Sequence, residues 1–436
     1  GICLGLHCGF TIVLSAFGVI PIHKFSRPSK ILCLIIGIVF SVLLVWNHIA
    51  KNSDQTVNKN LALNVYMNAD EVSRNPNVSK TMKYIHIWTG QDYSPLMFLG
   101  KGQSAFIKNN CSYHNCYVTK SRRFFDGDLT KFDAIAFNGR TLHPRDIPKI
   151  RSPHQKYIFF NLESPENHPV CSKVFDGFFN WTATYKLNSD IIYPYMRIRN
   201  KDGDIVGPRV DMEWLADYDN ANEDMTERIV NKTKAVAWFV SNCNKARRMR
   251  LVQNLQKSLA PYGYTVDVFG QCGSLKCPIT SKIDCNLMLN RDYYFYMSLE
   301  NSFAEDYVTE KVLNAVQLDV VPIVYGGADY TRFLPPGSYL DANLMKTEDL
   351  ALRINDLIKS PKKYMQYFNW KEHYKYSDPT RTENVCAVCA ALNSRKVFQQ
   401  TEYKEFRKWW HPKYENRCRL RNGWNSKHTK RKVKLS

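Results

Sequence analysis

The stretch AVAWFVSNCNKARRMRLVQNLQKSLAPYGYTVDVF, residues 235–269, decides the fold class. It opens with an apolar run, 235–240, of the kind found in a strand that is buried on both faces. Apolar side chains then recur at helical spacing over 245–260, and they are Met249, Val252, Leu255 and Leu259. A second short apolar run, 265–269, follows. A strand, a helix and another strand in this order predict two parallel strands of an α/β sheet.

The same alternation extends in both directions along the chain. Downstream, we expect strands and helices at 294–299, 308–317, 320–325 and 348–358. Upstream, apolar runs predict strands at 84–88, 134–137 and 157–162. A charged stretch, 211–234, separates the two groups. We therefore predict an α/β protein with two units, each a parallel sheet with helices on both faces, and a cleft between the units.

Length and composition agree with this organisation. A chain of 436 residues is too long for one ordinary domain, and its hydrophobic share of 44% excludes a wholly disordered chain. The net charge of +20 favours an anionic partner, which is nucleic acid, a phosphorylated small molecule or the headgroups of a membrane. The charge is dispersed except in the basic tail 417–434, which we interpret as a solvated end.

The N-terminal region predicts a membrane anchor. The apolar run ILCLIIGIVFSVLLVW, residues 31–46, carries no charge and is marginally long enough to span a bilayer with its flanks. Lys24, Arg27 and Lys30 precede the run and Lys51 follows it, so the positive-inside rule places the N-terminus in the cytosol. A cleaved signal peptide is the competing interpretation, and the upstream apolar run 2–22 is either a second span or a spurious extension.

Five segments follow from these patterns. They are a cytoplasmic and signal-anchor region at 1–50, a polar stem at 51–80, a first α/β domain at 81–225, a second α/β domain at 226–375, and a C-terminal segment with cysteines and a basic tail at 376–436. We expect a single-pass type II membrane protein, with the chain beyond the anchor on the far side of the membrane from the cytosol. A homodimer through the anchor or stem is compatible with this arrangement.

Cysteines and sequons agree with a luminal location. Candidate disulfide partners are Cys111, Cys116, Cys243, Cys272, Cys277, Cys285, Cys386 and Cys389, with Cys171 and Cys418 completing an even count beyond the anchor. A zinc site would need reduced thiolates, so disulfides are favoured. The Cys111/Cys116 and Cys386/Cys389 pairs can each close locally or cross over. Candidate N-glycosylation sites are Asn77, Asn110, Asn180 and Asn231.

Three clusters of polar residues follow predicted strands. One closes the strand at 294–299 and continues through Glu300, Asn301, Glu310 and Lys311 into a predicted helix start. Helix N-termini bind phosphates, Lys311 adds full charge to a departing phosphate, and Glu310 suits a ribose diol. Ligands of open α/β sheets bind beyond the carboxyl ends of the strands. The sequence therefore predicts a nucleotide site at this edge, although each motif alone also fits a solvated helix start.

The other two clusters supply further groups for such a site. Ser241 and Asn242 follow the strand at 235–240, and Arg248 in the next helix suits bidentate contact with phosphate. Glu163 closes the strand at 157–162, where a carboxylate across a cleft from a nucleotide is placed for general-base work on a sugar hydroxyl. Taken alone, Glu163 also fits a surface residue at the end of a strand.

These residues carry a resemblance to a known family. The runs N-L-E-S-P-E-N (161–167), F-F-N-W-T-A-T-Y (178–185) and A-W-F-V-S-N-C (237–243), and above all S-L-E-N-S (298–302) with D-Y-V-T-E-K (306–311), resemble the α1,3-fucosyltransferases. The likeness runs from about 84 to 410, and the S-N-C pattern is similar to invertebrate and plant members.

The resemblance implies a GT-B fold, an inverting reaction with GDP-fucose as donor, and no obligatory metal, although a metal could stimulate. It also implies a protein of the Golgi membrane with its catalytic part in the lumen. It implies a transfer of L-fucose to the 3-hydroxyl of a GlcNAc in the core or antenna of a glycoprotein N-glycan, with no nucleic acid as partner. By position, Glu163 matches the proposed general base. The matches to the GDP-fucose pocket are Arg248, Tyr296, Asn301, Tyr307, Glu310 and Lys311. Cys386 and Cys389 match a C-terminal C-x-x-C, and Cys243 and Cys272 match a cysteine pair of the S-N-C members.

Two alternatives differ in class. A metal-dependent glycosyltransferase would need a D-x-D motif, and such triplets occur at 126–128, 202–204 and 217–219, all in loop-like surroundings. An inactive relative that binds glycans or glycosaminoglycans would suit the positive charge. The intact Glu163, Glu310 and Lys311 speak against that second alternative.

Overall fold

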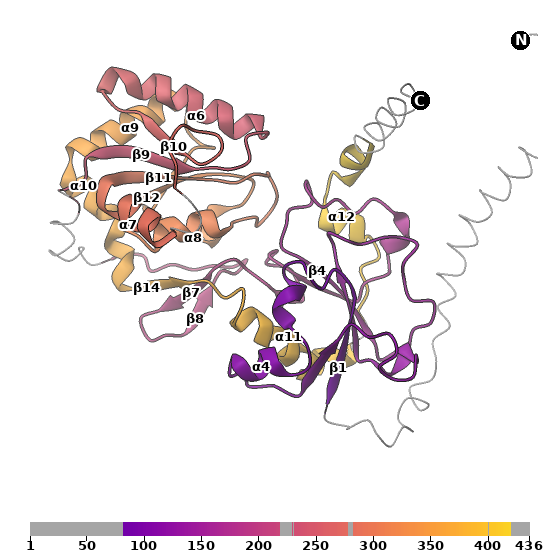
Figure 1. Cartoon of the computed structure of the whole chain (residues 1–436). Coiled ribbons are helices and arrows are strands. Elements are labelled where there is room, and N and C mark those ends of the chain that lie inside the picture. Colours follow the sequence, from indigo (N-terminus) through magenta and orange to yellow (C-terminus); the bar gives the residue numbers. More distant parts are fainter. Residues whose placement is uncertain (1–81, 219–228, 230, 278–281, 400, 420–436) are drawn as a thin grey trace, which may run out of the picture. The chain divides into compact units, whose positions relative to one another are not determined.

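Two parallel sheets and one small antiparallel sheet form the framework of the computed structural model (Figure 1). The structure describes residues 82–218, 229, 231–277, 282–399 and 401–419, all within the compact part Tyr66–Ser436. The predicted anchor and stem, and with them Asn77, lie outside the described residues. Within the described ranges, no helix is long and apolar enough to cross a membrane.

The first sheet has the strand order β2-β1-β3-β4-β5-β6, and every neighbouring pair is parallel. Its strands are β1 (Lys83–Thr89), β2 (Cys116–Thr119), β3 (Ala134–Asn138), β4 (Lys156–Asn161), β5 (Trp181–Thr184) and β6 (Ile191–Ile192). All residues of the central strands β3 and β4 are buried, as expected for strands that are covered on both faces. The apolar runs at 84–88, 134–137 and 157–162 correspond to β1, β3 and β4.

The second sheet has the order β10-β9-β11-β12-β13 and is also parallel throughout. Its strands are β9 (Lys234–Phe239), β10 (Val266–Phe269), β11 (Tyr293–Leu299), β12 (Val321–Tyr325) and β13 (Leu340–Asp341). The helices of this region are α6 (Ala246–Leu259), α7 (Lys282–Asp292), α8 (Glu310–Val316), α9 (Thr347–Lys359) and α10 (Pro361–Met365). Each strand and helix predicted here from periodicity is present within one to three residues.

Side chains of β9 alternate between two hydrophobic clusters, one on each face of the second sheet. Val236 and Trp238 pack in a cluster with Leu255 of α6 and Ile354 of α9. Ala237 packs in the opposite cluster with Leu289 of α7 and Ala315 of α8. Because successive strand residues point to opposite faces, this division shows that helices cover both faces, as predicted.

A third, antiparallel sheet was not predicted. It has the order β14-β7-β8, with β7 (Arg197–Asn200), β8 (Ile205–Gly207) and β14 (Tyr374–Ser377). Ile198 of β7 and Tyr374 of β14 pack with Val312 and Val316 of α8. The helix that carries Lys311 is therefore supported by β7, which precedes the second sheet along the chain, and by β14, which follows it.

The C-terminal segment packs on the first sheet. Helix α11 (Glu383–Asn393) contacts β1, β6 and α4 (Ser104–Lys108). The disulfides Cys111–Cys386 and Cys116–Cys389 fasten it there, so of the two pairings left open by the sequence the structure has the crossed one. In α12 (Phe406–Trp410), the ring of Trp410 lies 5.1 Å from that of Phe159 in β4. Three further disulfides are Cys171–Cys418, Cys243–Cys272 and Cys277–Cys285.

Candidate active site

The polar residues predicted around a nucleotide gather where β9 and β11 end. Ser241 and Asn242 follow β9, and Glu300 and Asn301 follow β11. The two strands are parallel neighbours, so their carboxyl ends meet at one edge of the second sheet. The prediction that these clusters share an edge is therefore confirmed by the register of the strands.

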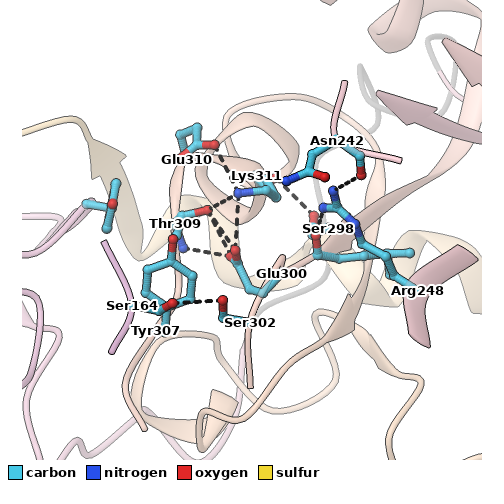
Figure 2. A network of polar contacts seen from close by, with 12 residues as sticks. Ser164, Asn242, Arg248, Ser298, Glu300, Ser302, Tyr307, Thr309, Glu310 and Lys311 are labelled. Atoms are coloured by element: carbon cyan, nitrogen blue, oxygen red, sulfur yellow. Dashed lines mark hydrogen bonds and ion pairs between the residues drawn. The ribbon is translucent and has the colours of Figure 1, made fainter. Parts of the chain in front are cut away.

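Glu300 is the centre of the network at this edge (Figure 2). Its side chain is 0% exposed, and its carboxylate accepts hydrogen bonds from the backbone N and the Oγ1 of Thr309, both at 2.9 Å. Lys311 Nζ lies 3.1 Å from Glu300 Oε2. Burial raises the pKa of Glu300, and the nearby ammonium and the two Thr309 donors offset this only in part. Glu300 thus fixes the turn that leads into α8.

Lys311 is surrounded by acceptors. Its Nζ donates to Thr309 Oγ1 at 2.7 Å and to Glu310 Oε1 at 3.0 Å, besides the ion pair with Glu300. Burial alone would lower the pKa of Lys311, but the two carboxylates outweigh it and raise the pKa, so the side chain stays an ammonium. Glu310 is 56% exposed and is the partner that can move away most easily.

Helix α8 is shorter than the sequence predicts. It begins at Glu310 rather than near Val308 and contains only seven residues. The expectation of a strong phosphate-binding helix terminus is therefore weakened, because a helix of two turns has a small dipole. The positive charge at this point comes from the side chain of Lys311.

Among the three arginines at the start of α6, Arg248 is the buried one. It lies in the first turn of α6 and is 5% exposed, whereas Arg247 and Arg250 are exposed. Its Nη2 donates to Asn242 O at 2.7 Å and its Nη1 to Leu299 O at 3.3 Å. The guanidinium therefore bridges the ends of β9 and β11, beside the network of Glu300 and Lys311 (Figure 2).

A cavity of about 240 Å³ opens at the same edge. Its lining includes Phe239 and Phe269, the polar side chains of Ser241 and Asn314, and Glu310. Tyr296 is 2% exposed and packs its ring 5.4 Å from that of Phe239, so it supports the aromatic wall from within. Aromatic faces with a few polar groups suit a nucleoside. Asn301 lies near this edge with its Oδ1 buried and without a hydrogen-bond partner among the described residues.

Glu163 of the first sheet is oriented through one oxygen. Its Oε1 accepts from Ser164 N at 2.8 Å, Asn167 Nδ2 at 2.9 Å and Tyr307 Oη at 2.7 Å. Among the described residues, no hydrogen bond reaches Oε2. Burial alone would raise the pKa of Glu163, but these three donors outweigh it and hold the pKa below its usual 4.5. The half-buried carboxylate is therefore ionised near neutral pH with one oxygen available.

Tyr307 joins Glu163 to the block 298–311. Asp306 beside it has φ of 56°, in the left-handed region, and is held there by two contacts. Its Oδ2 accepts from Leu187 N at 3.0 Å, and its Oδ1 lies 3.2 Å from Arg332 Nη1. Ser302 accepts from Ser164 at 2.7 Å between their hydroxyls. Hydrogen bonds between the two sheet regions therefore involve Glu163, the predicted base, and Tyr307, predicted to bind GDP-fucose.

Sequence reasoning missed several residues of this site. Thr309, Asp306, Ser302 and Asn167 all take part in its hydrogen bonds. Each lies inside one of the runs 161–167, 298–302 and 306–311, which carry the family resemblance. Their side-chain directions, which decide their roles, have no signal in the spacing of residues.

The remaining predicted sites lie elsewhere. Asn110 and Asn231 are exposed. Asn180 is half-buried, donates from Nδ2 to Thr401 O at 2.8 Å and accepts at Oδ1 from Tyr157 N at 2.9 Å, which disfavours an attached glycan there. Asp128 of the first D-x-D triplet caps a turn by accepting from Thr130 N at 3.0 Å. In the described ranges, no three His, Cys, Asp or Glu side chains gather as a metal site would require.

Comparison with known proteins places the chain among relatives of one kind. Residues 229–409 match the family model "Glycosyltransferase family 10 (fucosyltransferase) C-term", and residues 80–196 match "Fucosyltransferase, N-terminal". Alpha-(1,3)-fucosyltransferase C of Drosophila melanogaster is 31% identical over 96% of this chain and 98% of its own length.

Two further similarities are weaker. The 4-galactosyl-N-acetylglucosaminide 3-alpha-L-fucosyltransferase FUT6 of Pongo pygmaeus is 30% identical over 65% of this chain and 73% of its own length. A solved α1,3-fucosyltransferase with GDP-fucose has a TM-score of 0.44 at 14% identity, covering 74% of this chain and 94% of that one. From the family models and the full-length similarity to the Drosophila enzyme, we conclude that this chain belongs to glycosyltransferase family 10, the fucosyltransferases.

Proposed function

We propose that the chain transfers L-fucose from GDP-fucose to the 3-hydroxyl of a GlcNAc in a glycoprotein glycan, with inversion and with Glu163 as general base. The observation that carries this proposal is the 2.7 Å hydrogen bond from Tyr307 to Glu163 Oε1. It connects a carboxylate at the edge of the first sheet to the edge of the second sheet where β9 and β11 end, at which we propose that GDP-fucose binds. With the two so connected, the base can accept the proton of the attacking hydroxyl while the other site stabilises the leaving GDP.

The donor contacts are proposed from the second edge. The guanosine would enter the cavity between Phe239 and Phe269, with Glu310 accepting from the ribose hydroxyls. Arg248 and Lys311 would meet the diphosphate, whose negative charge grows as GDP departs. Lys311 can exchange its contact with the exposed Glu310 for a phosphate oxygen while it keeps the buried Glu300.

The chemical step follows from these positions. The acceptor O3 attacks C1 of fucose, the bond between C1 and the β-phosphate oxygen breaks, and GDP carries away the electron pair. The proton of the acceptor hydroxyl passes to Glu163, whose Oε2 is the oxygen without a described hydrogen bond. A carboxylate with a lowered pKa is ionised and ready at a mildly acidic luminal pH.

The compartment is part of the same proposal. The five disulfides among the described residues are typical of an oxidising lumen, and the apolar run 31–46 with its preceding basic residues is typical of a type II anchor. We therefore propose a Golgi enzyme with a luminal catalytic part.

One substitution tests the assignment of the base. Glu163→Gln keeps the shape and removes the charge, so turnover should fall by about 10²–10⁴-fold while affinity for GDP stays unchanged. Glu166→Gln is the matched control, because this carboxylate of the same loop pairs with His411 and Arg417 instead. Fucose transfer is measured with chitobiose, N-acetyllactosamine and LacdiNAc acceptors. Near-normal turnover by the Glu163 variant would exclude it as the base.

A further inference from the structure

A side chain from the segment between β9 and α6 reaches the loop that carries Glu163. Lys245 Nζ donates to Asn167 Oδ1 at 2.8 Å, and Asn167 Nδ2 donates to Glu163 Oε1 at 2.9 Å. Lys245 directly precedes α6, and Arg248 lies in the first turn of that helix. The segment 241–248, which ends in the first turn of α6, therefore contributes to three places. Ser241 lines the cavity, Arg248 bridges the ends of β9 and β11, and Lys245 contacts the loop that carries Glu163.

The Lys245 ammonium and the Glu163 carboxylate hold the Asn167 amide from its two ends. An amide has an oxygen that only accepts and a nitrogen that only donates. With Lys245 on Oδ1, the nitrogen must face Glu163, where it donates to the carboxylate. If the ammonium were absent, only Glu163 would still hold the amide, which could then turn away from the carboxylate and weaken its hydrogen bond to Oε1. Glu163 would then be held mainly by Ser164 and Tyr307.

The orientation of Glu163 matters because only one of its oxygens has no described partner. All three donors converge on Oε1 and leave Oε2 for another hydrogen. A base works only within hydrogen-bond reach of the proton that it accepts. Loss of the Asn167 donor therefore affects the reaction step more than the binding of the nucleotide.

We propose that Lys245 is a positioning residue: through Asn167 it orients Glu163 and so couples the segment 241–248 to the base. This inference rests on the proposed function. It predicts that Lys245 contributes to turnover without being a phosphate ligand, which distinguishes it from Arg248 and Lys311.

The experiment is a double-mutant cycle in the full-length chain. Lys245→Met keeps the stem and removes the ammonium, Asn167→Ala removes the amide, and the third variant combines both. Lys257→Met, which changes an exposed lysine of α6, is the matched control. We measure turnover of GDP-fucose with the best of the three acceptors, and the affinity for GDP by calorimetry. Thermal unfolding shows that each variant is folded, and Lys245→Arg, which keeps a donor, serves as the conservative variant.

We expect Lys245→Met and Asn167→Ala each to lower kcat by about tenfold, the effect of one lost charge-assisted hydrogen bond, with the affinity for GDP within about twofold of wild type. The double variant should lose no more than Asn167→Ala alone, because both changes interrupt the same contact. Lys245→Arg should retain more turnover than Lys245→Met, and Lys257→Met should match the wild type.

Three results would overturn the inference. They are unchanged turnover in Lys245→Met, a loss of GDP affinity in proportion to the loss of turnover, and additive losses in the double variant. If Glu163→Gln is inactive while Lys245→Met is normal, the inference fails and the proposed function stands. If the wild type transfers fucose to none of the acceptors, the proposed function and the inference fail together.

Discussion

Removing Lys311 should destabilise the fold as well as weaken the binding of GDP. Lys311→Met leaves the Glu300 carboxylate, 0% exposed, without the ammonium 3.1 Å away. Breaking a buried ion pair in this way costs about 3–5 kcal/mol. The two hydrogen bonds from Thr309 remain, so we expect the lower end, about 3 kcal/mol, which for a domain of this size lowers the melting temperature by about 6–12 °C.

The pH dependence of this loss has a definite sign. Burial already raises the pKa of Glu300, and removal of Lys311 takes away a charge that lowers it. The folded variant therefore binds a proton more tightly than its unfolded chain, so its stability falls as the pH rises from the unfolded toward the folded pKa. The deficit should be largest near neutral pH and should shrink as the buffer is made more acidic.

Thermal unfolding with the disulfides intact measures this prediction. The double variant Glu300→Gln/Lys311→Met has a neutral amide in place of the unpaired carboxylate and should recover most of the lost melting temperature. Lys359→Met, an exposed lysine on α9, is the control for a change of lysine to methionine. A melting temperature within about 2 °C of wild type in Lys311→Met at neutral pH would refute the role of Lys311 as counter-ion of Glu300.

Three further predictions concern the same site. Arg248→Ala should weaken GDP binding by about 1.5–3 kcal/mol through the loss of charge-assisted contacts to phosphate, and a normal GDP titration would show that the nucleotide binds elsewhere. Tyr307→Phe removes a donor that lowers the pKa of Glu163, so this pKa rises and the acidic limb of the pH profile of kcat should move to higher pH. An acidic limb at the wild-type pH would show that Glu163 does not determine it. Fucose transfer should continue in EDTA, and its abolition, with recovery on addition of Mn²⁺, would show that the reaction needs a metal.

The framework of both sheets could be predicted because their central strands are buried on both faces. Such strands are continuous apolar runs, as in β4 and β9, and the helix α6 has a regular apolar face. The strands β2, β5 and β6 have four residues or fewer and carry no pattern of their own. They are strands because a neighbouring strand in the finished sheet pairs with them, which is a tertiary effect.

The site could be predicted as a set of positions but not as a set of contacts. The ends of parallel strands share an edge, so Asn242 and Glu300 could be placed together from the order of elements. How deeply each side chain is buried could not be predicted in this way. Glu300, predicted to bind GDP-fucose, is fully buried against Thr309 and Lys311, whereas its near neighbour Glu310 is half exposed. The bond between Tyr307 and Glu163 joins residues 144 positions apart and depends on the left-handed Asp306 between the two sheets.

The contacts of the C-terminal segment also could not be predicted from the sequence. Its sequence predicted cysteine pairing and a basic end, yet its described residues reach the loop of Glu163. Trp410 Nε1 donates to His168 O at 2.9 Å, Arg417 Nε donates to Glu166 O at 2.7 Å, and Cys418 is bonded to Cys171. The two hydrogen bonds end on backbone carbonyls, which every residue type has, so the sequence of the loop does not indicate them. The disulfide joins two cysteines whose pairing the sequence left open. The loop that carries Glu163 is therefore held by Lys245 on one side and by the C-terminal segment on the other. A base held in this way loses little entropy when the acceptor arrives.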